Sequence, residues 1–158
     1  MKKLIQIALS EVVTLGEASD RIISLFQVIK TQRESGGKIG YVAGIINSDG
    51  PQSVKINRRR LTQYAKLLKK LHLFPIFSAA DIFTHRVNRT IQEMRLPIVE
   101  RESRVYIFWR KLLSSGHITD IFMTPRWEIS KGAVDEHKTA KRVGLKIHYV
   151  EKSFFPQG

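Results

Sequence analysis

Residues 117–150 read HITDIFMTPRWEISKGAVDEHKTAKRVGLKIHYV, and this stretch decides the fold class. It contains two short apolar runs, His117–Thr124 and Leu145–Val150, on either side of a helical pattern over Lys131–Val143. The helix has a favoured N-cap residue, Ser130, before it and a glycine typical of helix ends after it. A strand, a helix and a second strand in this order indicate a βαβ unit with parallel strands.

The same alternation continues toward the N-terminus. We predict buried strands at Lys38–Ile46 and His72–Ser78, separated by an amphipathic helix over Val54–Leu71. A further helix is expected over Ser103–Ser115, because its apolar residues recur at i, i+3, i+4 and i+7. Pro75 has no N–H for a neighbouring strand and therefore favours a sheet edge. This order predicts an α/β fold in which a mostly parallel sheet carries helices on both faces.

Residues 1–38 precede the first expected strand. We predict that they form an N-terminal helical extension packed on the main α/β domain, residues 39–158. Apolar spacing indicates a helix over Ala18–Arg33, with Ser19 or Asp20 as its N-cap. No shift in composition marks the extension as a domain of its own.

Ligands of parallel sheets bind beyond the carboxyl ends of the strands, at the point where the strand order reverses. The loops expected there are Gly44–Ser53, Ser78–Asp81 and Thr124–Gly132. Residues Ala79–Arg101 have mixed charges and weak periodicity, so we predict a loop region over the cleft with a short helix around Arg86–Met94.

The composition excludes several kinds of site. The chain has no cysteine, which rules out disulfides, thiolate metal ligands, iron–sulfur clusters and a thiol nucleophile. The histidines show no metal-ligand spacing, and no Walker or dinucleotide-binding glycine loop is present, so we expect neither a metal nor a cofactor. No apolar run is long enough to span a membrane, and we expect a cytoplasmic protein without a membrane partner.

The chain carries 27 Lys and Arg against 14 Asp and Glu, a formal net charge of +13. Such a charge attracts phosphate-bearing partners, either nucleotides or nucleic acid. Many of the cations lie on the helix expected over Val54–Leu71, and Arg58, Arg59, Arg60, Lys66, Lys69 and Lys70 form either a patch that follows a phosphate backbone or a solvated helix face. No aromatic platform for base stacking interleaves with them, which favours the solvated face. Arg58 or Arg59, near the start of that helix, is a candidate for pairing with a nucleotide phosphate.

The densest group of chemistry-bearing residues spans Met123–His137, where a predicted strand ends and a helix begins. The free N–H groups and positive dipole end of a helix N-terminus are suited to anions. Ser130 can cap the helix or donate to a phosphate, and Gly132 permits close approach of a ligand. Glu136 lies one turn further on, where a desolvated carboxylate can act as nucleophile or base. Alternatively, Glu136 is only an acid near the helix N-terminus that the helix dipole stabilises. Trp127, on the loop, is a candidate for stacking on a base.

The order Pro-x-Trp-Glu-x-Ser-x-Gly-Ala-x-x-Glu, followed by a glycine and a strand, resembles the DUF4406 family, which is similar to the nucleoside 2-deoxyribosyltransferases and deoxynucleotide N-glycosidases. The opening Tyr41-Val42-Ala43-Gly44 is similar to that family's Tyr-x-(Ala/Ser)-Gly. The resemblance covers about Ile39 to Val150 and implies a Rossmann-like (flavodoxin-like) three-layer sandwich with a sheet of about four to five strands. It also implies a homo-oligomer, with the N-terminal helix and the tail Phe154–Gly158 as candidate contact surfaces.

The resemblance implies roles for individual residues. Glu136 would attack C1′ of a deoxyribose, and water or a second base would then resolve the covalent intermediate. Tyr41 matches the tyrosine that positions this nucleophile. Gly44 matches the glycine against which the ligand lies, and Ser130 matches a phosphate-binding serine.

The chain departs from the family on the helix before the third strand. The enzymes carry an aspartate there that handles the proton of the leaving base, whereas Tyr106–Leu113 contains no carboxylate. Asp81 or Glu102 is an alternative proton donor, although the spacing requires neither. Ile45 also replaces the family's proline, and Trp109 is expected in the core.

Two functions therefore stay open. The first is an N-glycosidase or deoxyribosyltransferase acting on a nucleoside or nucleotide through Glu136. The second is a non-catalytic module that senses a nucleotide or binds nucleic acid, which the missing aspartate and the positive charge both favour.

Overall fold

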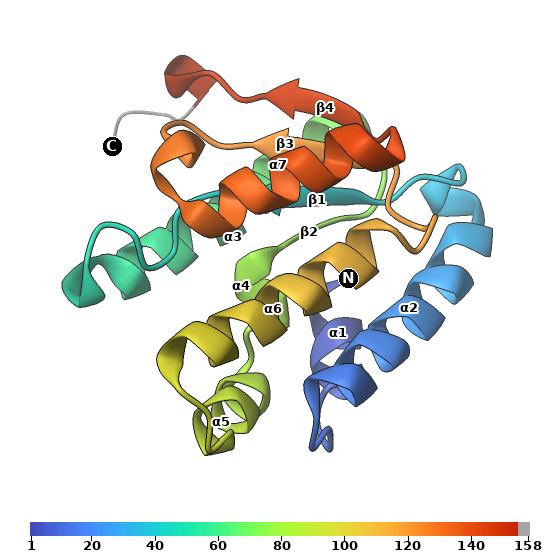
Figure 1. Cartoon of the computed structure of the whole chain (residues 1–158). Helices are drawn as coiled ribbons and strands as arrows, with labels where there is room; N and C mark the ends of the chain where they lie inside the picture. Colours follow the sequence, from blue (N-terminus) through green and yellow to red (C-terminus); the bar gives the residue numbers. More distant parts are fainter. Residues whose placement is uncertain (155–158) are drawn as a thin grey trace.

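The computed structural model describes residues 1–154 and has one four-stranded, all-parallel sheet (Figure 1). The strands are β1 (Gly40–Ala43), β2 (Ile76–Ser78), β3 (Asp120–Met123) and β4 (Lys146–Tyr149), in the order β2-β1-β3-β4. Every neighbouring pair is parallel. The predicted α/β fold with a parallel sheet is confirmed, and β2 lies at an edge as Pro75 indicated.

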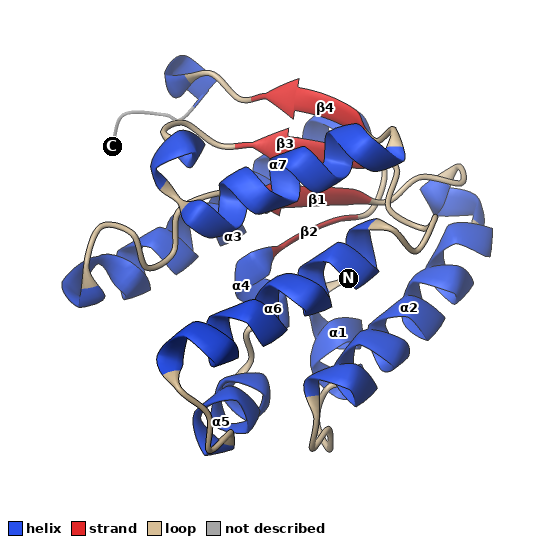
Figure 2. Ribbon diagram, viewed as in Figure 1, coloured by secondary structure: helices blue, strands red, loops and turns tan. Residues whose placement is uncertain are grey.

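Helices cover both faces of the sheet and give it the Rossmann-like, flavodoxin-like three-layer form (Figure 2). Helix α3 (Val54–His72) packs on one face, against β1 and β2. Helices α6 (Ile98–Leu113) and α7 (Lys131–Val143) cover the other face. The chain leaves β1 toward β2 and later returns to place β3 on the opposite side of β1, so the strand order reverses between β1 and β3.

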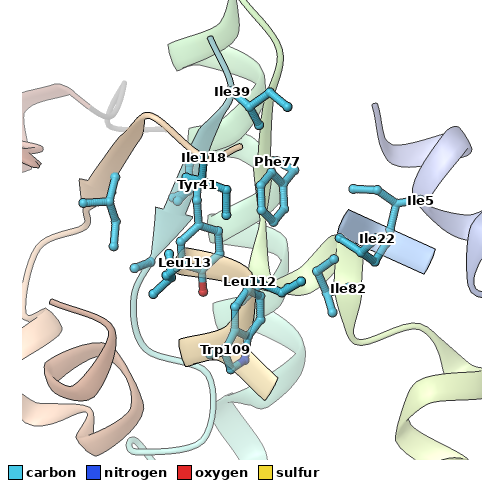
Figure 3. Packing of buried hydrophobic residues seen from close by; sticks show 14 of the residues in the cluster. Ile5, Ile22, Ile39, Tyr41, Phe77, Ile82, Trp109, Leu112, Leu113 and Ile118 are labelled. Atoms are coloured by element: carbon cyan, nitrogen blue, oxygen red, sulfur yellow. The ribbon is translucent and has the colours of Figure 1, made fainter. Parts of the chain in front are cut away.

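The N-terminal residues form α1 (Lys2–Ala8) and α2 (Leu15–Thr31). Ile5 and Phe26 are fully buried in the same hydrophobic cluster as the sheet, and Figure 3 shows Ile5 beside this core. The cap predicted at Ser19 or Asp20 is wrong. Thr14 caps α2 by accepting a hydrogen bond from the Glu17 N–H at 3.0 Å, so the helix begins earlier and Ser19 lies buried inside it.

The prediction of a loop region over residues 79–101 is also wrong. Helix α4 (Ala79–Ile82) begins directly at the end of β2, because Ser78 and Asp81 form a capping box. Helix α5 (His85–Glu93) follows at once, capped by the Thr84 hydroxyl, and it corresponds to the short helix that was expected. Helix α6 then starts five residues earlier than the periodicity indicated, after Pro97.

The strands are shorter than their apolar runs, because only the central residues of each run pair with a neighbour. Helix α7 has the predicted bounds, with Ser130 as N-cap and Gly144 in the left-handed region at φ 76°. Short 3-10 turns complete the described chain: η1 (Arg33–Ser35), η2 (Pro51–Ser53), η3 (Trp127–Ile129) and η4 (Lys152–Phe154). No helix within residues 1–154 is long and apolar enough to cross a membrane. Residues 155–158 of the predicted contact tail lie outside the described residues.

Candidate functional site

The loops after β1 and β3 meet at the point where the strand order reverses. The Thr124 N–H and hydroxyl both donate to the Ala43 carbonyl, at 3.0 and 3.1 Å. Further out, the Arg126 guanidinium pairs with the Asp49 carboxylate at 3.1 Å. Two of the three predicted ligand loops are therefore joined at the edge of the sheet where ligands of such folds bind.

Helix α7 begins beside this junction. The Ser130 hydroxyl accepts a hydrogen bond from the Ala133 N–H at 3.3 Å, which leaves its own O–H free to donate. A Cβ built at Gly132 would be in ordinary van der Waals contact with the Ser130 hydroxyl and the Tyr106 ring, both at 3.9 Å. The helix N-terminus is thus formed and capped, and the Tyr106 ring lies beside it.

Glu136 lies one turn into α7, and only 7% of it is exposed. Burial raises the pKa of its carboxyl to about 8, the Tyr41 hydroxyl opposes this rise, and neighbouring Asp135 adds to it. The cause is that a carboxylate loses its water in the core and meets a second negative charge. Glu136 is therefore a predominantly protonated acid at neutral pH and ionises in mildly alkaline solution.

Tyr41 faces Glu136 from β1 and is fully buried. Burial raises the pKa of its phenol well above the ordinary value, and the nearby Glu136 raises it further. The Tyr41 hydroxyl lies close enough to the Glu136 carboxyl to lower its pKa, but this contact falls short of full hydrogen-bond geometry and no other described residue meets it. Because buried hydroxyls are rarely left unsatisfied, Tyr41 keeps unused hydrogen-bonding capacity at this site.

Trp109 of α6 closes the other side of Tyr41, as Figure 3 shows. Their rings stack with centroids 4.7 Å apart and planes at 25°. Trp109 also contacts Phe83 and Phe108 edge-on, and it lies in the core as expected. Aromatic side chains therefore line the α6 side of the site.

Tyr106 is the polar side chain that α6 turns toward the site, and the sequence interpretation missed it. Its ring approaches Gly132, and it is half-buried. Burial raises the pKa of its phenol, followed by the charges of Glu102, Asp135 and Glu136. Its spacing of three residues from Trp109 puts both on one helical face, which is the signal that could have identified it.

An ion pair fixes α6 against α7 at this place. The Arg110 guanidinium donates several hydrogen bonds to the Asp135 carboxylate. Its Nε lies 2.9 Å from Oδ2 and 3.2 Å from Oδ1, and its Nη2 lies 2.5 Å from Oδ1. This two-pronged geometry holds the helix that carries Glu136 in position relative to Tyr106.

The two alternative carboxylates have other surroundings. Asp81 accepts hydrogen bonds from the Ser78 N–H and hydroxyl at 2.8 and 3.2 Å, as the cap of α4. Glu102 is exposed on α6 and acts on Tyr106. Neither contributes to the pKa of Glu136. Asp81 serves as a helix cap, and the charge of Glu102 raises the pKa of Tyr106.

Three residues expected to bind substrate are engaged with the protein itself. Arg58 donates to the carbonyl of Phe83, and burial lowers the pKa of its guanidinium. Half-buried Trp127 packs on His137 with centroids 4.3 Å apart. Gly44 is required because a Cβ there would lie 2.0 Å from the Thr124 hydroxyl oxygen. The need for this glycine therefore arises from the packing of the two loops.

A hollow of about 470 Å³ lies elsewhere, between α3, β3, β4 and the segment after β4. In it, His148 Nε2 lies 2.7 Å from the buried Asp120 carboxylate, and the His148 ring stacks on Phe122. None of the predicted site residues lines this hollow, so it is distinct from the Glu136 site. Its lining residues are Leu68, His72, Phe122, His148, Tyr149, Val150, Glu151, Ser153 and Phe154.

Among residues 1–154, no three histidine or acidic side chains gather closely enough to hold a metal ion. Comparison with protein-family models, with curated proteins and with solved structures finds no match to this chain.

Proposed function

We propose that the chain binds a nucleoside or nucleotide beside the N-terminus of α7 and cleaves its N-glycosidic bond with Glu136 as nucleophile. One observation carries the proposal: a buried glutamic acid faces a buried tyrosine hydroxyl at the reversal of strand order. The resemblance of residues 125–136 to the DUF4406 motif supports the same assignment.

In this proposal the helix N-terminus receives the anionic part of the ligand. The first N–H groups of α7 and the free O–H of Ser130 point to a phosphate or a sugar hydroxyl. Because Gly132 has no side chain, the sugar can approach the backbone of the helix closely. Tyr41 donates its phenolic proton toward the Glu136 carboxylate, which stabilises the ionised form.

The reaction takes two steps. An oxygen of the ionised Glu136 forms a bond to C1′ while the C1′–N bond breaks, and the base leaves with the bonding electrons and takes up a proton from solvent water. A water then attacks C1′ and gives its proton to the solvent, or a second base attacks in a transferase; the bond between C1′ and Glu136 breaks, and Glu136 leaves as a carboxylate. Because only ionised Glu136 is nucleophilic, the rate rises with pH up to about 8.

A second function, nucleotide binding without cleavage, is supported by a different observation. Trp109, an apolar side chain, stacks on Tyr41 from the helix where the enzymes have their aspartate. A general acid or base contributes about 10²–10⁴-fold to rate, and its loss favours a sensor. In this version the protonated Glu136 donates a hydrogen bond to the ligand.

One experiment separates the two functions. The purified protein is incubated at about pH 8 with 2′-deoxynucleosides and their 5′-monophosphates, and free base is measured by chromatography. The glycosidase predicts release that is lost in Glu136→Gln and kept in Glu93→Gln, an exposed control on α5. The sensor predicts no release but a ligand-dependent rise in melting temperature that Glu136→Gln retains. Absence of both effects contradicts both functions.

A further inference from the structure

Helix α3 lies on the face of the sheet opposite α6 and α7 (Figure 1). It presents a row of cations to solvent. Each residue of an α-helix turns the chain by about 100°, so the spacings of +4, +11, +14 and +15 fall within an arc of about 100°. This row, called the α3 stripe, consists of Lys55, Arg59, Lys66, Lys69 and Lys70, all of them exposed.

The α3 stripe is an arrangement in which like charges repel. Lys55 and Arg59 are four residues apart, and Lys66 lies three and four residues before the other two lysines. Like charges at these spacings are neighbours on a helix and destabilise it. Lys55 also lies in the first turn of α3, where the positive end of the dipole disfavours a cation and where no acid is present.

No acid relieves this repulsion. Helix α3 contains no Asp or Glu over its whole length. Within residues 1–154 none of the ion pairs involves an α3 side chain, whereas cations elsewhere, such as Arg110 and Arg126, have carboxylate partners. Arg58, which lies outside the α3 stripe, turns to the Phe83 carbonyl instead. The α3 stripe therefore lacks a counter-charge within the described chain.

The length and composition of the α3 stripe favour a double-stranded partner of B-form geometry. From Lys55 to Lys70 it spans about 22 Å along a helix that the major groove of B-form DNA can admit. No exposed aromatic side chain lies among the cations, so single strands gain no stacking. The deep, narrow major groove of A-form RNA excludes a helix. We propose that the α3 stripe binds the phosphate backbone of double-stranded DNA.

This binding is independent of the proposed glycosidase site, because α3 and α7 cover opposite faces of the sheet. Phosphate contacts carry no sequence information by themselves, and the inference is therefore of binding without sequence preference. Neutralisation of five phosphates predicts that log K falls against log salt concentration with a slope of about −4.5.

The test measures fluorescence anisotropy of a labelled DNA duplex of about two helical turns over a series of salt concentrations. The triple variant Lys66→Gln, Lys69→Gln, Lys70→Gln keeps good helix formers and should reduce the slope by about 3 in magnitude. A charge-matched control changes three exposed cations of α7: Lys138→Gln, Lys141→Gln and Arg142→Gln. This control should leave the slope within about 1 of the unaltered protein.

Four results would overturn the inference. The first is no binding of the DNA duplex, and the second is an equal reduction of the salt-dependence slope in the two triple variants. The third is an unchanged slope in the α3 variant when circular dichroism shows that this variant is folded. The fourth is tighter binding of an RNA duplex or a single strand than of duplex DNA. Because none of these readouts depends on base release, they are separate from the outcome for Glu136.

Discussion

Replacing Glu136 with glutamine should remove a pH-dependent loss of stability. The folded protein holds the pKa of this carboxyl at about 8, against 4.5 for an unperturbed glutamate. Between these values the folded state binds a proton that the unfolded state has released. The free energy of unfolding therefore falls as pH rises, by about 1.4 kcal/mol for each pH unit.

The size of the effect follows from the two pKa values. At pH 7 the carboxyl destabilises the fold by about 3 kcal/mol relative to its protonated form, and above pH 8 by about 5 kcal/mol. The isosteric Glu136→Gln cannot ionise and escapes this loss. Its advantage over the unaltered protein should be close to zero near pH 4.5 and should grow until about pH 8.

Urea unfolding at constant ionic strength, followed by tryptophan fluorescence, measures this difference. Trp109 stacks on Tyr41 and therefore reports on the site itself. The other titrating groups cancel when the two proteins are compared, and Glu93→Gln serves as a control that should keep the slope of the unaltered protein. Parallel stability curves for Glu136→Gln and the unaltered protein from about pH 5 to about pH 9 would refute the burial argument.

Three further substitutions test other parts of the structure. Gly44→Ala should lower the free energy of unfolding by about 1–3 kcal/mol, because its Cβ clashes with the Thr124 side chain. In a Thr124→Ala background the same change should cost less, and strict additivity in this double-mutant cycle would contradict the clash. Tyr41→Phe removes the hydroxyl that opposes the pKa rise of Glu136, so the pH at which stability stops falling should move upward in the same urea assay. An unchanged or lower pH would contradict this role of the Tyr41 hydroxyl. Asp120→Ala removes the acceptor of His148, while the Thr119 hydroxyl keeps the Ile39 carbonyl, and the change should cost about 1–3 kcal/mol; a cost below about 0.5 kcal/mol would disagree with the buried contact.

The sequence predicted well wherever the deciding forces are local. The N-cap and glycine end of α7 depend on residues within one turn, and its bounds are as predicted. Pro75 placed β2 at an edge for an equally local reason, the missing N–H. By contrast, the mixed charges over Ala79–Arg101 masked the caps at Ser78 and Thr84. Helix α4 was therefore not predicted, and α5 was predicted only as a short helix within a loop region.

The site was predictable only as far as its motif. Glu136 and Tyr41 were paired through the resemblance, and the fold brings them together from α7 and β1. The surroundings depend on packing between distant segments, which no local pattern encodes. Trp109 stacks on Tyr41 because α6 packs beside α7, and Gly44 is required by Thr124, which is eighty residues away. For the same reason, Arg58 donates a hydrogen bond to the carbonyl of Phe83, between α4 and α5, although the sequence indicated a phosphate partner.

The proposed glycosidase reaction requires Glu136 to form a covalent bond to a sugar carbon. The most direct test is to quench the protein with acid while it turns over a 2′-deoxynucleoside 5′-monophosphate, and to map the modified peptide by mass spectrometry. Our account predicts a deoxyribosyl phosphate adduct on Glu136, more abundant at about pH 8 than at about pH 6 and absent from Glu136→Gln. Base release with no adduct, or with an adduct on another residue, would contradict it.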